Sequence, residues 1–212
     1  MTETVAVIVA SYGDKQFWDS LAERAIASVT QQSRQPDDFI RIHGEDLHSC
    51  RNEGAERAKT DLLCFLDCDD ELEPGYLEAM LSPAVYPIEM RYPRVRYVTE
   101  NLVDMNYMPA PIILPRRSLD RGNFMVIGTV IPRETFLDAG GFRELRAYED
   151  WDCWIRLWML GAEPRLVPGA IYRATKRRGS RNIIKDPQLV CQDIITFNKQ
   201  WQAEMKRSGR IR

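Results

Sequence analysis

The N-terminal third of the chain repeats one pattern, an apolar run of strand length followed by a helix-like stretch, and this repetition constrains the fold most. Val5–Val9 and Leu62–Leu66 are apolar throughout, which is typical of strands buried on both faces of a parallel sheet. The pattern predicts helices at residues 15–32 and at Ser49–Lys59, where Ser49 is the N-cap. It predicts a short strand at Phe39–Ile42. The pattern favours an α/β fold with a mostly parallel central sheet and helices on both faces.

The rest of the chain follows a less regular pattern. Prolines crowd the segment 83–115 and exclude long helices there. In Glu149–Leu160 the side chains of Trp151, Trp154 and Trp158 share one helical face, and we expect them to be core residues rather than sugar-stacking ones. Further strands are expected at Arg94–Thr99, Phe124–Ile131, Leu166–Val167 and Ala170–Tyr172, and a last amphipathic helix at Pro187–Lys206.

Length and charge suggest how the chain is organised. Its 212 residues allow one domain with a full core or two small domains. We expect a domain over residues 1–182 and a basic C-terminal helix or tail over residues 183–212 that packs on it or extends from it. The net charge of −2 hides an excess of Lys and Arg from Arg173 onward, but no uniformly basic footprint for nucleic acid is present. The basic segment suits ligand phosphates, an anionic surface, the acidic body of the protein or simple solvation.

Cysteine spacing and hydropathy bear on the environment of the protein. The five cysteines occur at irregular spacings without a Cys-x-x-Cys pair, which supports neither a disulfide scaffold nor a structural zinc site. The N-terminus lacks a basic region ahead of an apolar core, and no apolar run is long enough to cross a bilayer. We therefore expect a cytoplasmic protein with reduced thiols and no integral membrane segment.

A dense acidic turn follows the third predicted strand. Four carboxylates lie within five residues, namely those of Asp67, Asp69, Asp70 and Glu71. Such charges repel one another unless a cation or hydrogen-bond donors compensate them, and carboxylate oxygens are the ligands that Mg2+ and Mn2+ prefer. An EF-hand loop is excluded because its glycine position holds Leu72. The turn favours a metal site shared with substrate phosphates; the alternative is a solvated acidic turn that caps a following helix.

Four segments, in order along the chain, resemble those of the family 2 glycosyltransferases, which have the GT-A nucleotide-sugar fold. They are Val7–Tyr12 for the opening strand, Arg51–Asp70 for the helix, strand and Asp-x-Asp block, Gly140–Phe142 for a glycine turn, and Glu149–Leu157 for a Glu-Asp motif. The resemblance implies transfer of a sugar from a nucleoside-diphosphate sugar, most commonly a UDP-sugar, to an acceptor hydroxyl with inversion, using Mn2+ or Mg2+. The acceptor stays open between a protein, a glycan and a small molecule.

The resemblance also implies roles for individual residues. Asp69 and Asp67 are the metal residues, and Asp67 also faces the nucleoside ribose. Asp150 is the base that deprotonates the acceptor, with Glu149 beside it in the catalytic motif. The other donor-binding positions are Ser11, Tyr12, Glu45, Arg51, Asn52, Cys68 and Arg181. We do not expect Cys68 to be a nucleophile, because neighbouring carboxylates raise the pKa of a thiol.

These roles agree with the chemistry of sugar transfer. A bound cation neutralises the leaving diphosphate, and a positioned carboxylate activates the hydroxyl, an effect of about 10²–10⁴-fold. Asp150 would lie in the first turn of a helix, where the helix dipole favours its ionised form. Taken alone, Glu149 and Asp150 could simply be favourable first-turn acids. Their position between the glycine turn and the tryptophan face favours catalysis.

Two departures from the family pattern affect the site. The segment 43–46 stands where an Asp-Asp-Gly-Ser turn is usual. Glu45 or Asp46 would then contact the nucleobase, and the identity of the donor nucleotide is left open. Thr175 stands where many relatives carry a His. In its absence, the anionic groups of the donor would meet one of Arg177, Arg178 and Arg181.

Two other functions compete with the glycosyltransferase interpretation. A sugar nucleotidyltransferase shares the fold class, but it would carry a glycine-rich basic loop after the first strand, where Ala10–Asp14 has one Gly and no Arg. A catalytically silent carbohydrate- or protein-binding relative is the second alternative, which the missing His keeps open. Hydrolase, P-loop and dinucleotide-binding motifs are absent from the sequence.

Overall fold

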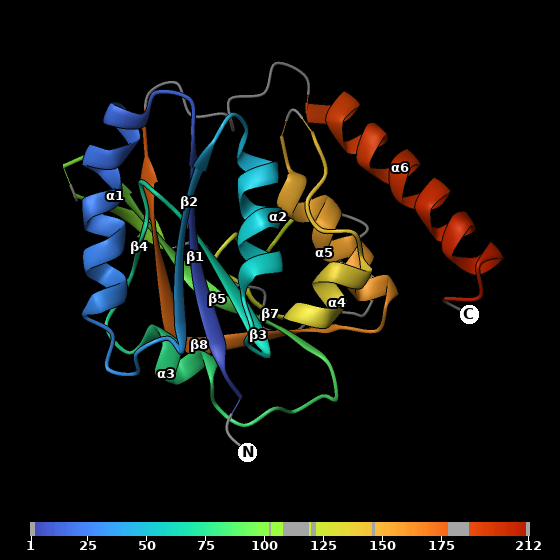
Figure 1. Cartoon of the computed structure of the whole chain (residues 1–212), viewed down its shortest axis with the longest axis horizontal. Coiled ribbons are helices and arrows are strands. Elements are labelled where there is room, and N and C mark those ends of the chain that lie inside the picture. Colours follow the sequence, from blue (N-terminus) through green and yellow to red (C-terminus); the bar gives the residue numbers. More distant parts are fainter. Residues whose placement is uncertain are drawn as a thin grey trace.

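The computed structural model describes residues 3–101, 103–107, 119, 122–145, 147–177 and 187–210. Its elements in chain order (Figure 1) are β1 (Val5–Tyr12), α1 (Lys15–Thr30), β2 (Asp38–Gly44), α2 (Leu47–Arg57), β3 (Leu62–Asp67), β4 (Glu71–Leu72), α3 (Tyr76–Met80), β5 (Glu89–Thr99), β6 (Asp104–Tyr107), β7 (Val130–Pro132), α4 (Arg133–Asp138), α5 (Glu149–Met159), β8 (Glu163–Lys176) and α6 (Pro187–Arg207). The α/β class predicted from the repeated strand–helix pattern is confirmed.

The sheet combines parallel and antiparallel strand pairs. Its strand order is β2-β1-β3-β7-β5-β8-β4, with β6 paired to β5. β1 runs parallel to both β2 and β3, and the apolar side chains of β1 and β3 are buried, as their sequences predicted. β7 runs antiparallel to β3 and β5, β4 runs antiparallel to β8, and β5 and β8 form a parallel pair. Most of the paired residues of the sheet lie in the three parallel pairs β1-β2, β1-β3 and β5-β8, as predicted, and short antiparallel pairs connect β7, β4 and β6 to them.

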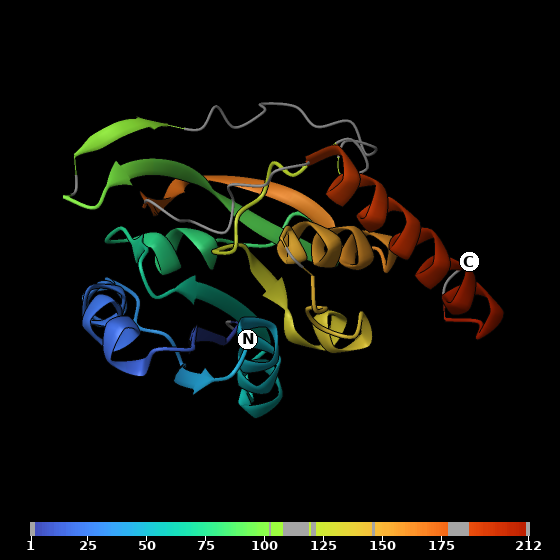
Figure 2. The same ribbon diagram turned by 90° about the horizontal axis from the view of Figure 1, so that it is seen from above.

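Helices cover both faces of the parallel strands β1 and β2. Figure 2 shows α1 and α2 on opposite sides of β1 and β2. The close approach of α2 to the sheet depends on Gly54, where a Cβ would lie 2.5 Å from the side chain of Ile8. α6 packs against α5, with Asn198 donating a hydrogen bond to Asp152 over 2.9 Å. No helix in the described part of the chain, α6 included, is long and apolar enough to cross a membrane.

Some local predictions need correction. α2 begins after Asp46, whose carboxylate accepts a hydrogen bond from the Ser49 N–H over 2.8 Å, so Asp46 is the N-cap rather than Ser49. The strand predicted at Phe124–Ile131 is limited to β7, because a hydrogen-bonded turn occupies Val126–Thr129. The two short strands predicted within residues 166–172 belong to one long strand, β8. The short elements β4, β6 and α4 were not predicted.

Candidate active site

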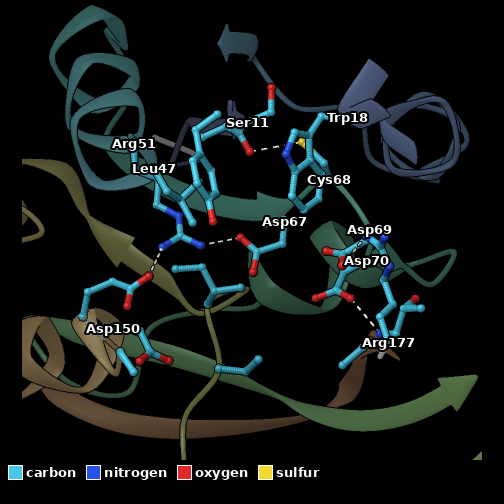
Figure 3. A pocket seen from close by; sticks show the side chains of 18 of the residues that line it. Ser11, Trp18, Leu47, Arg51, Asp67, Cys68, Asp69, Asp70, Asp150 and Arg177 are labelled. Carbon is cyan, nitrogen blue, oxygen red and sulfur yellow. Dashed lines mark hydrogen bonds and ion pairs between the residues drawn. The ribbon is translucent and has the colours of Figure 1, made fainter. Parts of the chain in front are cut away.

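A cavity of about 430 Å³ brings the two acidic segments of the sequence together. It lies at the carboxyl ends of β1 and β3, and its wall also includes residues from α1, α2, β5, the N-terminus of α5 and the end of β8. Figure 3 shows Asp67 between Asp150 on one side and the neighbouring Asp69 and Asp70 on the other. The cavity therefore occupies the place where open α/β sheets bind their ligands.

Arg51 of α2 joins the two acidic segments. Its guanidinium donates to Asp67 at the end of β3 (Figure 3) and, over 3.0 Å, to Glu149 at the start of α5. The residue is 3% exposed, and its guanidinium lies over the ring of Phe142 at 5.3 Å. Burial alone would lower the pKa of Arg51, but the charges of Asp67 and Glu149 outweigh burial and raise that pKa above its ordinary value. Arg51 is therefore a permanent cation between two carboxylates.

The carboxylates of the acidic turn lie in different environments. Asp70 is buried and accepts hydrogen bonds from the Tyr172 hydroxyl over 2.8 Å and from the Thr175 N–H over 2.7 Å. Asp69 is partly buried and forms an ion pair of 3.3 Å with Arg177. Burial, followed by repulsion from neighbouring aspartates, raises the pKa of both carboxyls. The turn is thus more than a solvated cap, since β8 holds Asp70 while Asp69 lines the cavity.

Asp150 lies in the first turn of α5, as predicted. Its two carboxylate oxygens accept hydrogen bonds from the Asn123 amide over 3.1 Å and from the Trp151 N–H over 2.7 Å. Burial, and next the charge of Glu149, raise the pKa of Asp150 to about 6, so these effects outweigh the stabilisation that the helix dipole was expected to provide. A carboxyl with this pKa is mostly ionised at neutral pH and more basic than an exposed Asp.

The backbone just before this helix is strained. Tyr148, the N-cap of α5, has a φ of 61°, in the left-handed region that residues with a side chain rarely adopt. Its side chain lines the cavity beside Glu149 and Asp150. Strain of this kind is commonly found next to functional groups, because the fold must hold them in one orientation.

Aromatic residues that the sequence reasoning missed form another part of the wall. Phe17 and Trp18 of α1 line the cavity, and the guanidinium of Arg177 lies over their rings at 4.9 and 5.6 Å. The ring of Tyr12 stacks on that of Trp18 at 6.1 Å. Phe17 falls within the helix predicted at residues 15–32, and its side chain is 44% exposed. The sequence signal for its role was its place in the first turn of a helix directly after a buried strand.

The predicted donor-binding residues divide into those that reach the cavity and those that do not. Those that line it are Ser11, Tyr12, Arg51, Asp67 and Cys68. Glu45 is exposed and is not part of the lining. Asn52 points elsewhere: its side chain donates to the Phe142 carbonyl and accepts from the Phe142 N–H, each over 2.8 Å, and so holds the glycine turn. Arg181 lies outside the described residues.

Two small polar residues lie at the ends of β1 and β3. Ser11 Oγ lies 3.0 Å from His43 Nδ1 on the neighbouring strand β2. The Cys68 thiol donates to the Ala10 carbonyl over 3.1 Å. Burial, followed by the charge of Asp67, raises the pKa of that thiol to about 12. Cys68 therefore stays protonated, in agreement with the expectation that it is not a nucleophile.

The cavity offers part of a divalent-cation site. Within the described ranges, no three His, Cys, Asp or Glu side chains are placed so that they could hold a metal ion. Asp67 and Asp69 nevertheless present hard oxygen donors to the cavity. The buried hydroxyl of Thr175, another lining residue, has no hydrogen-bond partner among the described residues. These groups fit a Mg2+ or Mn2+ ion that takes its remaining ligands from a bound diphosphate.

Sequence relatives of the chain are glycosyltransferases. Pre-mycofactocin glycosyltransferase of Mycobacterium tuberculosis (strains CDC 1551 / Oshkosh and ATCC 25618 / H37Rv) is 29% identical over 176 residues, which cover 71% of this chain and 36% of the relative. EpsH of Bacillus subtilis (strain 168), also named as a glycosyltransferase, is 30% identical over 84 residues, which cover 39% of this chain and 22% of EpsH. The chain thus spans about a third or less of the length of these relatives.

A solved structure shares the fold. The crystal structure of GalNAc-T7 with UDP, GalNAc and Mn2+ matches with a TM-score of 0.62 at 15% identity, over 84% of this chain and 45% of that chain. This likeness shows the GT-A fold that the sequence resemblance implied. The family described as "Glycosyltransferase like family 2" matches residues 6–169, a range that includes both acidic segments of the cavity. The chain therefore belongs to glycosyltransferase-like family 2.

Proposed function

We propose that the chain transfers a sugar from a nucleoside-diphosphate sugar, in the first instance a UDP-sugar, to an acceptor hydroxyl with inversion at the anomeric carbon. The observation that carries this proposal is the shared cavity, in which Asp67 and Asp69 lie across from Asp150. Sugar transfer requires a stabilised leaving diphosphate and an activated hydroxyl. A cation held by Asp67 and Asp69 would stabilise the diphosphate, and Asp150 would activate the hydroxyl. Family membership and the UDP and Mn2+ in the GalNAc-T7 structure support this class of donor.

The donor would occupy the side of the cavity at the ends of β1 and β3. Asp69 and Asp67 would hold Mn2+ or Mg2+ together with diphosphate oxygens, and the bound cation would neutralise charge on the leaving group. Tyr12 and Trp18 offer aromatic faces to the nucleoside at the same end of the cavity. Arg51 holds the carboxylate of Asp67 in place.

Asp150 would accept the proton of the acceptor hydroxyl. Its pKa of about 6 leaves it ionised at neutral pH, and the hydrogen bonds from Asn123 and Trp151 fix the orientation of the carboxylate. General-base catalysis of this kind contributes about 10²–10⁴-fold to the rate. Glu149, which is paired with Arg51, orients the site rather than taking the proton.

We propose that residues 1–182 carry this activity and that residues 183–212 are a helical extension. α6 supports the division of roles because it packs on the back of α5, the helix that bears Asp150. The contact includes Asn198 and Asp152, both buried. The extension would thus hold the helix of the general base in place.

A release assay tests the proposed function. The full chain is incubated with a panel of nucleotide sugars, with Mn2+ or Mg2+, and release of nucleoside diphosphate is measured with and without EDTA. We expect metal-dependent release with UDP-sugars. Asp69→Ala should lose metal-dependent UDP binding in calorimetry, Asp150→Asn should bind UDP but not turn over, and the exposed Asp138→Asn should behave as wild type.

Two outcomes would contradict the proposal. Pyrophosphate release from a nucleoside triphosphate would identify a nucleotidyltransferase. Binding of carbohydrate or nucleotide sugar with no turnover of any donor would identify a silent binding relative.

A further inference from the structure

Arg177, directly after β8, holds the carboxylate of Asp69 at the cavity (Figure 3). Its Nη1 lies 3.3 Å from Asp69 Oδ2, and its Nε lies 3.3 Å from Glu100 Oε1. The guanidinium also lies over the rings of Phe17 and Trp18, and the side chain is 17% exposed. Two carboxylates and two aromatic faces therefore keep this cation at the place where a donor diphosphate would meet Asp69.

This arrangement gives Asp69 a counter-ion that belongs to the chain itself. A divalent cation that binds Asp69 must displace the guanidinium of Arg177 or lie close to it, and like charges at such separations repel strongly. No three Asp, Glu, His or Cys side chains in the described ranges form a cage that could offset this loss. Without a bound nucleotide, the cation would therefore meet Asp69 already paired with Arg177 and few further ligands.

A nucleoside diphosphate changes the balance in two ways. Its phosphate oxygens supply the cation ligands that the chain lacks. They also offer the guanidinium of Arg177 a new anionic partner, and a planar guanidinium pairs with phosphate as readily as with carboxylate.

We propose that Arg177 competes with the divalent cation for Asp69, so that the cation binds tightly only when a nucleoside diphosphate arrives with it. This inference rests on the proposed function, because it takes Asp69 as a ligand of the donor's metal. Arg177 is then a positioning residue that couples metal binding to donor binding. Because coupling is reciprocal, loss of Arg177 should strengthen binding of Mn2+ alone and reduce the factor by which UDP strengthens it further.

Arg173, on β8 shortly before Arg177, provides a matched control. Its guanidinium forms ion pairs with Glu71 over 3.0 Å and with Glu73 over 3.4 Å, and it is not part of the cavity lining. Its replacement removes one positive charge from β8 without releasing Asp69.

The test is a titration of the nucleotide-free full chain with Mn2+, in which unbound aquo-Mn2+ is followed by electron paramagnetic resonance. We expect Arg177→Gln to bind Mn2+ at least about tenfold more tightly than wild type, which corresponds to about 1.4 kcal/mol, and Arg173→Gln to match wild type. At saturating UDP the advantage of Arg177→Gln should shrink to less than about threefold. Arg177→Lys, which keeps the charge without the planar fork, should fall between wild type and Arg177→Gln.

The outcomes separate this inference from the proposed function. If folded Arg177→Gln binds Mn2+ no more tightly than wild type, Arg177 does not compete with the cation. Should Arg177→Gln fail to fold, Arg177→Lys takes its place, and Mn2+ binding no tighter than that of wild type then contradicts the inference. If Asp69→Asn loses binding of Mn2+ with UDP while Arg177→Gln is unchanged, the proposed function stands and this inference falls. If Asp69→Asn binds Mn2+ and UDP as wild type does, the metal assignment itself fails.

Discussion

Nη1 of Arg51 lies 3.0 Å from Oε1 of Glu149, a residue 98 positions further along the chain. The same guanidinium donates to Asp67, so one buried cation connects the end of β3 with the start of α5. The distance between the two acidic segments is therefore set by a side chain that pairs with both.

Replacing Arg51 should destabilise the fold. Arg51→Gln leaves Asp67 and Glu149 facing each other without a counter-charge, and removal of one partner from a buried ion network costs about 3 kcal/mol. Arg57→Gln is the control on the same helix, because its pair with Glu53 is exposed and its loss should cost less than about 1 kcal/mol. Urea unfolding measures both values. Equal losses for the two variants would show that the bridge contributes little.

Replacing Asp150 should stabilise the protein at high pH while it abolishes transfer. Folding raises the pKa of Asp150 from 3.8 to about 6, so the folded state binds the proton more tightly than the unfolded state does. Ionisation of this carboxyl therefore lowers the free energy of unfolding as pH rises through this range. Asp150→Asn avoids that loss and should exceed wild type by about 1–2 kcal/mol at pH 8.

The pH dependence is the control for this prediction. At about pH 4 the Asp150→Asn and wild-type proteins should unfold at similar urea concentrations, since the wild-type carboxyl is then largely protonated in the folded state. Asp138→Asn, at an exposed position, should show no such difference between the two pH values. A stability gain of Asp150→Asn that is equal at both pH values would contradict the assigned pKa.

Asn123 should set the pH at which activity is lost. Its amide donates to Oδ2 of Asp150 over 3.1 Å and thereby favours the ionised carboxylate. Asn123→Ala should raise the pKa of Asp150, and because the base must be ionised, the acid limb of kcat/KM should move to higher pH. Glu149→Gln removes the neighbouring like charge and should move the limb to lower pH. If the acid limb of kcat/KM does not move in Asn123→Ala, Asn123 does not affect the pKa of Asp150.

The two glycines before α5 should differ in their response to alanine. Gly140 and Gly141 both have positive φ values, of 82° and 65°, but a Cβ at Gly141 would lie 2.5 Å from Oδ1 of Asn52, whereas one at Gly140 meets nothing within 4 Å. Gly140→Ala should cost about 1 kcal/mol through backbone strain. Gly141→Ala should cost about 2 kcal/mol more, because Asn52 must also release Phe142. Equal losses in denaturant unfolding would mean that Asn52 moves aside freely.

The regular elements were largely predictable because burial leaves a local pattern. The apolar runs located β1 and β3, and helical periodicity located α1, α5 and α6. The tryptophan face was correctly assigned to the core, since Trp151 is 4% exposed, Trp154 is 0% exposed and Trp158 is partly buried against the same core. Elements of two to six residues, such as β4, β7 and α4, are too short to show a period and depend on pairing with distant strands.

The candidate site was predictable in its residue types but not in all its contacts. Asp70 looks like its acidic neighbours in sequence, yet Tyr172 and Thr175 of β8 bury it and occupy its oxygens. Asn52, next to Arg51 on α2, faces the glycine turn instead of the cavity. Such differences between neighbours arise from strand and helix packing, which no short segment encodes.

The sequence by itself determined which strands are buried and that acidic groups follow one strand and begin one helix, because these features depend on neighbours along the chain. Only the tertiary structure decided that Arg51 pairs with both Asp67 and Glu149, that Arg177 pairs with Asp69, and that Asp150 has a pKa near 6. The physical reason is that charge interactions and desolvation depend on distances through space, between groups that lie far apart in the chain.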